Sequence, residues 1–289
     1  MLGQFVINGL ITGVLYSLLA IGFALVYNTT KIFHVAAAAI YVAAAYTFWF
    51  FSNRLGLPLW TGGLIAVVVT MAVSLLTECT VYRPLKKKNS SLNVVMIASI
   101  GIVTVLVNLI AMVFSNETKV ISNEIMKVYN LGDIIITTPQ MVQLIVGMVV
   151  IVAFMVFISR TDWGIRLRAI SCDEELYGTM GYDPMKTRNF VFLLSGVFIA
   201  LASCLTVFDV GLDPHMGMNV LINAMVAMII GGVGRFGTCV AGGLILGILQ
   251  SLVVFQFASN WQNAITFLVL LIFLFLRPQG IAGYKQRAV

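Results

Sequence analysis

Long stretches with few or no charged side chains dominate this sequence, and they restrict its fold more than any other feature. Nine of them recur along the 289 residues, at 5–27, 33–51, 59–81, 93–115, 139–159, 189–210, 219–233, 238–258 and 261–276. A helix that crosses a bilayer needs ~20 mainly apolar residues. Charged residues make up only 10% of the chain, whereas soluble domains typically carry about 25%. The sequence therefore predicts an all-α, polytopic membrane helix bundle, without the alternating short strands of a barrel.

Two of the apolar segments are unusual, which leaves the number of crossings at eight or nine. Segment 219–233 would span roughly 22 Å as a helix, less than the ~30 Å hydrocarbon core. Segment 33–51 is rich in alanine and has a histidine near its start. We therefore expect short or broken helices in the bundle. The side of the membrane on which the N-terminus lies stays open, because it depends on whether the chain crosses eight or nine times.

Basic residues gather in loops that fall on one side of the membrane if every segment after the third crosses. They are Arg83, Lys86, Lys87 and Lys88 in loop 82–92, those of the insert 160–188, Arg235, and Arg277, Lys285 and Arg287 near the C-terminus. Loop 116–138, with Glu117, Lys119, Glu124, Lys127 and Asp133, has no basic excess. Cytoplasmic loops carry the excess of Lys and Arg. We therefore expect a multi-pass protein of the bacterial cell membrane with a cytoplasmic C-terminus.

The polar insert 160–188 contains five basic and five acidic residues between two apolar segments. Ser171 and Glu174 have the spacing of a capping box, and Gly181 is placed to end a helix. Asp183 followed by Pro184 favours the start of the next helix. The pattern predicts a short amphipathic helix over 171–181. Three interpretations stay open: a solvated loop, a helix in the lipid headgroups, or a surface that docks on a cytosolic protein.

Several other classes of site have weak or no support in the sequence. The four cysteines are scattered, so we expect free thiols and no metal site. The net charge of +6 is explained by cytoplasmic loops, and no nucleic-acid partner is expected. Gly232, Gly234 and Gly237 match G-x-G-x-x-G, but an apolar segment precedes them and no acidic residue follows in 238–289. No ATP-binding P-loop motif occurs, and we expect no cofactor.

Glycines predict close helix packing in two places. Gly9 and Gly13, and likewise Gly243 and Gly247, form small-x-x-x-small patterns on apolar segments. Such patterns let helix backbones approach, within one subunit or at a subunit or pore face. Gly231, Gly232, Gly234 and Gly237 predict a tight turn between two helices.

Several stretches resemble the permease subunits of ABC importers for branched-chain amino acids, short amides and urea. They are "GVLYSLLAIGFALVY", "TDWGIRLRAI" with "MGYD", "DPHMGMNVLINAMVAMIIGGVGRFGTCVAGGLILGILQ" and "LRPQGIAG". The resemblance runs nearly end to end and implies a single permease domain over 1–289. It also implies a second permease subunit, in a homo- or heterodimer, two cytosolic ATPases that hydrolyse the ATP, and an extracytoplasmic solute-binding protein. The chain itself would then be no enzyme, and lipid would surround it.

In that family the cytoplasmic loop docks on an ATPase, so the resemblance implies that 160–188 is a coupling loop. The expected contact residues are Arg166, Arg168, Asp173, Glu174, Glu175, Leu176, Met180 and Gly181. The family usually reads Asn-Phe-Ala-(His or Gln)-Gly-Glu before its second helix. Here His34 replaces the Asn, and alanines occupy the later polar positions. The usual solutes are therefore in doubt.

Four polar residues are candidates for the solute path. His34 has the position of the family's polar Asn, and Asn219 and Asn223 are four residues apart in a short apolar segment. Asp209 ends another segment. A self-sufficient secondary transporter or channel is the alternative function, but it predicts acidic residues within the membrane, and few are present. Glu78 is one of them, and we expect it to pair with Arg83 or to reach lipid headgroups.

Overall fold

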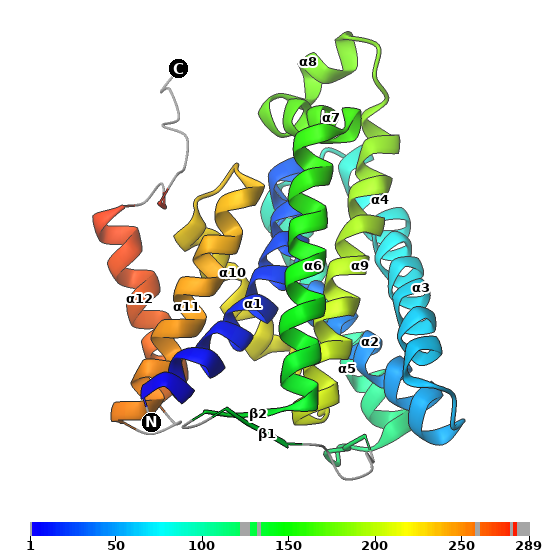
Figure 1. Ribbon diagram of the computed structural model, residues 1–289. Helices are drawn as coiled ribbons and strands as arrows, with labels where there is room; N and C mark the ends of the chain where they lie inside the picture. Colours follow the sequence, from blue (N-terminus) through cyan, green and yellow to red (C-terminus); the bar gives the residue numbers. More distant parts are fainter. Residues whose placement is uncertain (1, 122–127, 132–133, 258–260, 278–279, 282–289) are drawn as a thin grey trace. The chain divides into compact units, whose positions relative to one another are not determined.

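The computed structural model describes residues 2–121, 128–131, 134–257, 261–277 and 280–281. These residues are predominantly helical (Figure 1). Glu124, Lys127 and Asp133 of loop 116–138 and Lys285 and Arg287 near the C-terminus lie outside the described residues.

Each of the nine apolar segments corresponds to a helix, which confirms the predicted all-α membrane bundle. The helices are α1 (Leu2–Thr30), α2 (Ala37–Trp49), α3 (Leu59–Thr77), α5 (Leu92–Phe114), α6 (Thr138–Arg160), α9 (Pro184–Val210), α10 (Met216–Gly231), α11 (Phe236–Gln256) and α12 (Gln262–Leu276). Within the described residues, six helices are long and apolar enough to cross a membrane. Short helices were also predicted correctly for segments 33–51 and 219–233, since α2 has 13 residues and α10 has 16.

Two helices continue into π-helical turns. The segment η1 (Phe50–Arg54) extends α2, and η2 (Glu78–Tyr82) extends α3 into the short helix α4 (Arg83–Lys87). In η2 the backbone N–H of Arg83 bonds to the carbonyl of Glu78, five residues earlier. Single π-helical turns inside α-helices are rare and frequently lie at functional sites.

The contacts divide the chain into two compact units, each assembled from separate stretches of sequence. The first comprises 1–24, 123–153 and 222–289, and the second comprises 25–122 and 154–221.

In the first unit, α1 and α11 cross at their glycine motifs. A Cβ atom at Gly247 would lie 2.4 Å from the Cα of Gly13, and one at Gly243 would lie 2.6 Å from the backbone N of Ser17. A Cβ at Gly147 of α6 would lie 2.3 Å from the side chain of Val14 on α1. Small residues thus permit close backbone contact within this subunit, where lipid provides little hydrophobic drive for association.

An antiparallel hairpin of β1 (Val128–Leu131) and β2 (Ile134–Thr137) also belongs to the first unit. Val128 pairs with Thr137, and Leu131 pairs with Ile134. Gln4 near the start of α1 exchanges two hydrogen bonds with the backbone of Ile135, at 2.7 and 2.8 Å. The sequence predicts only a loop over 116–138, because the strands of this hairpin are too short to give a clear alternation.

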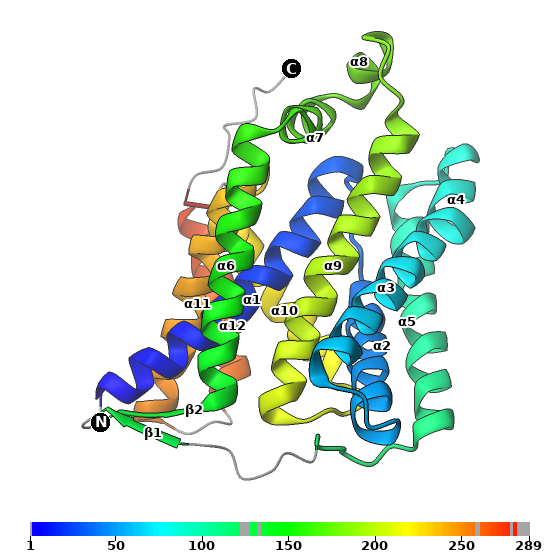
Figure 2. The same cartoon turned by 45° about the vertical axis from the view of Figure 1, so that its right-hand side comes forward.

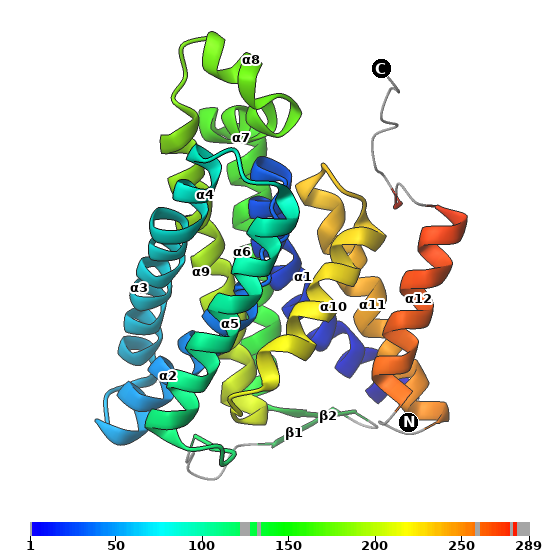
Figure 3. The same cartoon turned by 180° about the vertical axis from the view of Figure 1, so that it is seen from behind.

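In the second unit, α3 packs against α9, with α2 and α5 beside them (Figures 2 and 3). Ser74 of α3 donates a hydrogen bond to the carbonyl of Phe192 on α9, at 2.7 Å. Ser203 of α9 donates one to the carbonyl of Tyr41 on α2, also at 2.7 Å. Buried hydroxyl groups thus tie together helices that are otherwise apolar.

The insert forms two helices, α7 (Asp162–Cys172) and α8 (Glu174–Thr179). The predicted capping box is wrong, because Ser171 lies in the last turn of α7 and its hydroxyl donates to the carbonyl of Arg168. Asp173 caps α8 instead, since its carboxylate accepts from the N–H groups of Glu175 and Leu176. The helix is also shorter than predicted, because α7 takes up Ser171 and Cys172.

The remaining local signals in the insert were predicted correctly. Gly181 follows α8 with φ +86°, a conformation that glycine adopts without strain. Asp183 caps α9 by accepting from the N–H groups of Met185 and Lys186, and Pro184 is the first residue of that helix. The short-range caps thus fix where the insert ends and α9 begins.

Candidate functional site

Exposed apolar side chains interrupt the charged surface of the insert. Ile165 on α7 is 59% exposed, Leu176 on α8 is 60% exposed and Met180 is 67% exposed. Leu176 and Met180 are four residues apart, so both side chains lie on one face of the α8 region. Large exposed apolar side chains grouped on a polar segment are typical of a protein contact surface. We call Leu176 and Met180 the insert tip, and Ile165 is a further exposed apolar residue of the insert.

Charged and polar residues of the insert make contacts that hold its own shape. The guanidinium of Arg166 lies 5.1 Å from the centre of the Trp163 ring and 5.2 Å from that of Tyr182. Arg168 is exposed, and its Nε donates to the carbonyl of Gly164 at 3.1 Å. Glu174 forms an ion pair with Lys86 of α4. Of the expected contact residues, Arg168, Asp173, Glu175, Leu176, Met180 and Gly181 are exposed, whereas Arg166 and Glu174 are half-buried.

Three further contacts attach the insert to the spanning helices. Gly164 of α7 packs on the end of α6, where a Cβ would lie 2.0 Å from the carbonyl oxygen of Ile158. The hydroxyl of Tyr177, on α8, lies 3.0 Å from that of Thr187 on α9. Lys31, directly after α1, donates to the carbonyl of Ser171 at 3.2 Å. Partial burial lowers the pKa of the Lys31 ammonium, and the nearby Cys172 acts in the opposite direction.

Glu78 forms a buried ion pair with Arg188, so the expected pairing with Arg83 or with headgroups is wrong. The Nε of Arg188 lies 2.9 Å from one carboxylate oxygen of Glu78, and its Nη2 lies 3.3 Å from the other. The two side chains are 2% and 0% exposed. Glu78 faces α9 where that helix packs on α3, while Arg83 lies five positions further along its own helical stretch. The carboxylate is thus satisfied from a neighbouring helix.

His34 lies in the interior of the second unit, with no exposed surface. Its Nδ1 is 2.8 Å from the hydroxyl of Tyr82, which is also 2.8 Å from the hydroxyl of Ser99 on α5. Ser99 accepts a hydrogen bond from the backbone N–H of Ala36. The rings of Tyr82 and Phe192 meet the imidazole edge to face. His34 therefore links three segments from the inside and does not border the pocket described next.

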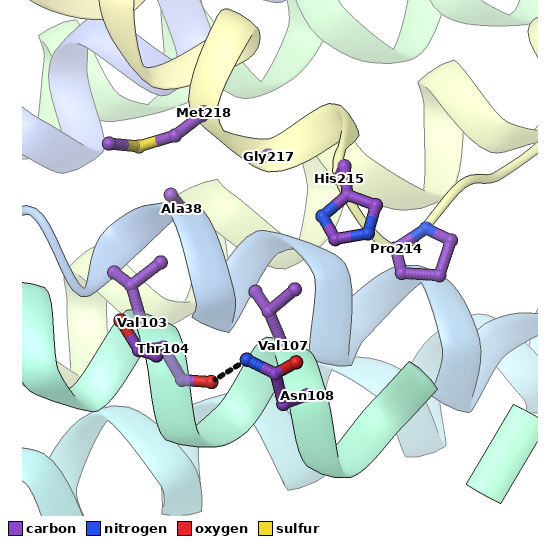
Figure 4. A pocket seen from close by; sticks show the side chains of 9 residues that line it. All are labelled: Ala38, Val103, Thr104, Val107, Asn108, Pro214, His215, Gly217 and Met218. Atoms are coloured by element: carbon purple, nitrogen blue, oxygen red, sulfur yellow. Dashed lines mark hydrogen bonds between the residues drawn. The ribbon is translucent and has the colours of Figure 1, made fainter. Parts of the chain in front are cut away.

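A pocket of about 210 Å³ opens between α2, α5 and the start of α10 (Figure 4). It is lined by Ala38, Val103, Thr104, Val107, Asn108, Pro214, His215, Gly217 and Met218. Thr104, Asn108 and His215 contribute polar groups, and the valines and Met218 form an apolar wall. The side-chain N–H of Asn108 donates to the carbonyl of Thr104 at 2.7 Å. The pocket thus combines uncharged hydrogen-bonding groups with an aliphatic surface, as is usual for sites of small organic molecules.

The other solute-path candidates lie outside this lining. Asn219 is exposed on α10, four residues after His215. Asn223 is buried in the first unit, where it donates to the hydroxyl of Tyr16 at 3.1 Å and accepts from Gln250 at 3.1 Å. Thr266 of α12 joins this cluster. Asp209 is half-buried in the last turn of α9.

The candidate glycines lie at close contacts and at one turn of the first unit. Gly231 ends α10, and a Cβ there would lie 2.3 Å from the carbonyl oxygen of Thr238. Gly232 and Gly234 have φ of +104° and +102° in the turn before α11, and Gly237 lies in its first turn. The G-x-G-x-x-G pattern therefore lies in a turn between two helices, whereas a dinucleotide fold would require a strand before it.

A multi-pass helical protein with an amphiphilic pocket against its spanning helices and a structured polar insert has the architecture of a membrane transport protein. Comparison with known protein families then identifies the particular family of transport proteins. Residues 5–274 match the family of the branched-chain amino acid transport system permease component. The chain belongs to this family.

Curated relatives agree with this family. The chain is 26% identical to the high-affinity branched-chain amino acid transport system permease protein BraD of Pseudomonas aeruginosa, over 98% of this chain and 96% of BraD. It is 28% identical to the probable permease protein LivH of Methanocaldococcus jannaschii, over 92% and 88% of the two chains. The LivH permease of Escherichia coli K12 is 26% identical, over 98% and 96%.

A solved structure has the same fold. PsaBC from Streptococcus pneumoniae in complex with Fab matches with a TM-score of 0.55 at 17% sequence identity. The match covers 96% of this chain and 93% of that chain. At this level of identity the likeness shows the fold alone.

Sequence reasoning missed several polar residues that the structure brings together. No pattern in the sequence indicates a role for Tyr82 or Ser99, and Arg188 is one of the five basic residues of the insert. Arg188 and Glu78 are 110 positions apart. One signal for Arg188 was available in the sequence. It is a charged residue near the start of a segment that becomes apolar, and a charge there has a high free-energy cost in the membrane unless it is paired.

Proposed function

We propose that the chain is the permease subunit of an ATP-driven ABC importer that carries branched-chain amino acids. The family match over 270 of its residues, 5–274, carries this proposal. The proposal includes a second permease subunit, two cytosolic ATPases that hydrolyse ATP, and an extracytoplasmic solute-binding protein. It also places the C-terminus and the insert 160–188 in the cytoplasm, as the distribution of basic residues favours.

The insert is proposed as the coupling loop that docks on an ATPase. Its tip offers the exposed apolar side chains of Leu176 and Met180 to a partner groove, and Ile165 on α7 is exposed as well. Exposed charges at Arg168, Asp173 and Glu175 surround this surface and would give the contact its orientation. Arg166, Glu174 and Gly181 would shape the loop, through the aromatic contacts, the ion pair with Lys86 and the turn after α8.

The pocket beside α2, α5 and α10 is proposed as part of the solute path. Val103, Val107 and Met218 suit a short branched aliphatic chain, and Thr104, Asn108 and His215 suit the polar groups of an amino acid. Asn219 would extend the polar surface along α10. His34 would support the wall from inside the unit. Asn223 and Asp209 would act at a distance, since neither lines the pocket.

Alternating access would follow from the coupling loop and the pocket. Closure of the ATPases on ATP would move the insert, and the spanning helices would then expose the pocket to one side or the other. Such a cycle requires that ATP binding favours one state through contacts that differ between the states. Among the residues that the structure describes, the insert tip would make those contacts with the ATPase.

The experiment reconstitutes the complete transporter in proteoliposomes and compares Leu176→Asp with Thr179→Asp. Both residues are exposed on α8, but only Leu176 belongs to the insert tip. We expect Leu176→Asp to reduce ATP hydrolysis stimulated by the leucine-loaded binding protein by about tenfold, because a charge at a buried apolar contact costs more than 1.4 kcal/mol. Thr179→Asp is expected to stay near the wild type.

Two results would contradict the proposal. One is unchanged stimulated hydrolysis in Leu176→Asp with the ATPases still bound. The other is leucine flux through liposomes that contain this chain alone, without ATPases, which would instead indicate a self-sufficient transporter or channel.

A further inference from the structure

The buried ion pair between Glu78 and Arg188 is expensive to maintain. Both charges are removed from water, with the guanidinium 2% and the carboxylate 0% exposed. In proteins, replacing such a pair by apolar residues of similar volume is often neutral or stabilising. A gain in stability is therefore a weak explanation for the presence of this ion pair. The residues that surround the pair in the fold give better evidence of its role.

On one side, the pair connects to α8. Arg188 directly follows Thr187, whose hydroxyl lies 3.0 Å from that of Tyr177. Tyr177 is buried, although Leu176 and Met180 on either side of it are exposed at the insert tip. A movement of α8 therefore acts on the first turns of α9 through a hydroxyl contact and a buried aromatic ring.

On the other side, the pair connects to the pocket wall. Glu78 and Tyr82 lie four residues apart at the two ends of η2. The Tyr82 hydroxyl contacts His34 before α2 and Ser99 on α5, both at 2.8 Å. Ala38 of the pocket lining lies four residues after His34, and Val103 lies one turn after Ser99. The chain of buried contacts thus reaches α5 and the residues directly before α2, and α2 and α5 are two of the three helices that line the pocket.

The segment between Glu78 and Tyr82 is the π-helical turn η2. A π-helical turn is closed by hydrogen bonds between residues five apart, and such turns frequently lie at functional sites. Coupling between distant sites requires an element with two discrete arrangements that both sites can bias. The turn η2 would be such an element, and the Glu78–Arg188 ion pair holds one end of it.

We propose that Arg188 and Glu78 are positioning residues that transmit the movement of α8, through η2 and the hydroxyl of Tyr82, to the α2 and α5 walls of the pocket. The inference rests on the proposed function, because it assigns to the same site the connection between ATP-driven movement and solute release. Neither residue touches the solute in this scheme.

The test uses the complete transporter in proteoliposomes and the double variant Glu78→Leu with Arg188→Met. The apolar pair keeps the volume of the contact, so the thermal midpoint is expected to stay close to that of the wild type. The amount of leucine imported per ATP hydrolysed is expected to fall about fivefold or more, which is the lower range of measured couplings between sites. A merely structural role would change the midpoint and the yield, but not this ratio.

A second variant and a control keep the result interpretable if the double variant does not fold. Tyr177→Phe removes only the hydroxyl that meets Thr187, and we expect the same ratio to fall about threefold or more. Ser203→Ala is the control, since it removes another buried hydrogen bond of α9, to Tyr41, that lies outside the chain of contacts. Its ratio is expected to equal that of the wild type.

The outcomes separate the two proposals. If the wild type imports no leucine at the expense of ATP, the proposed function fails. If the wild type does so, and the folded double variant or Tyr177→Phe keeps the wild-type ratio, the positioning role is overturned. A fall in Ser203→Ala as large as in Tyr177→Phe would also overturn it, because any buried hydrogen bond of α9 would then have the same effect.

Discussion

The backbones of Gly13 on α1 and Gly247 on α11 meet so closely that a Cβ at Gly247 would lie 2.4 Å from both the N and the Cα of Gly13. Real Cβ atoms do not approach backbone atoms to such distances. The contact brings Ser17 close enough to donate a hydrogen bond to the carbonyl of Val240, at 2.9 Å. This crossing therefore depends on the absence of side chains at two positions.

Gly247→Ala is expected to destabilise the subunit by about 1–3 kcal/mol or more, because the added methyl group must separate two packed helix backbones. The thermal midpoint of the detergent-solubilised protein, followed by size-exclusion chromatography after heating, measures this loss. Gly101→Ala on α5 is the matched control, since a Cβ there would meet nothing within 4 Å. Equal midpoints for the two variants would contradict the prediction.

Gln250→Met is expected to cost about 1–2 kcal/mol, because it removes the amide that joins Asn223, Thr266 and Gln262 across three helices. Single hydrogen bonds between membrane helices are worth roughly 0.6 kcal/mol each, and the remaining buried polar groups add the cost of lost partners. Unfolding in denaturant would measure the change. Gln256→Met, an exposed position of the same helix, is expected to have little effect.

Asp173→Ala is expected to loosen α8, because its carboxylate accepts from the first free N–H groups of that helix. Loss of such a cap costs about 0.5–2 kcal/mol. Hydrogen exchange at the amides of Glu175 and Leu176 should accelerate accordingly. Ser171→Ala distinguishes this structure from the capping box that the sequence suggested. Faster exchange at the amide of Glu174 in Ser171→Ala, with unchanged exchange at the amides of Glu175 and Leu176 in Asp173→Ala, would instead support the capping box, in which the Ser171 hydroxyl accepts from the N–H of residue 174.

Thr104→Phe is expected to lower leucine import by about tenfold or more, since an aromatic ring would fill much of the pocket and remove a polar group. ATPase binding and protein yield should be unaffected, because the side chain is exposed. Leu109→Phe places the same ring on an exposed position of α5 outside the lining. Similar import by the two variants would argue against a role of the pocket in the solute path.

Local signals in the sequence predicted much of the fold. The apolar runs gave the nine helices because spanning segments must satisfy their own backbone hydrogen bonds. Asp183 with Pro184 and Gly181 were interpreted correctly, since a cap or a turn depends on neighbouring residues alone. Ser171 was misinterpreted because the helix that starts after Thr161 extends through it, and the length of that competing helix was not apparent from its mixed composition.

The candidate site was less predictable because it depends on contacts between distant residues. His34 was expected on the pore wall from its position in the sequence, but the rings of Tyr82 and Phe192 enclose it. Glu78 was expected to pair with Arg83 or to reach lipid headgroups, whereas the packing of α3 on α9 brings Arg188 to it. Neither outcome can be derived from periodicity, which specifies the buried face of a helix but not its neighbour.

The π-helical turn at Glu78–Tyr82, which joins α3 to α4 without a break, has a consequence for the descent of the family. This turn accommodates one surplus residue without displacing the helices before and after it. Lineages that gained or lost a residue there would retain both flanking helix faces in register. Single-position gaps in aligned homologues are therefore expected inside this apparently continuous span, as well as in the connecting loops.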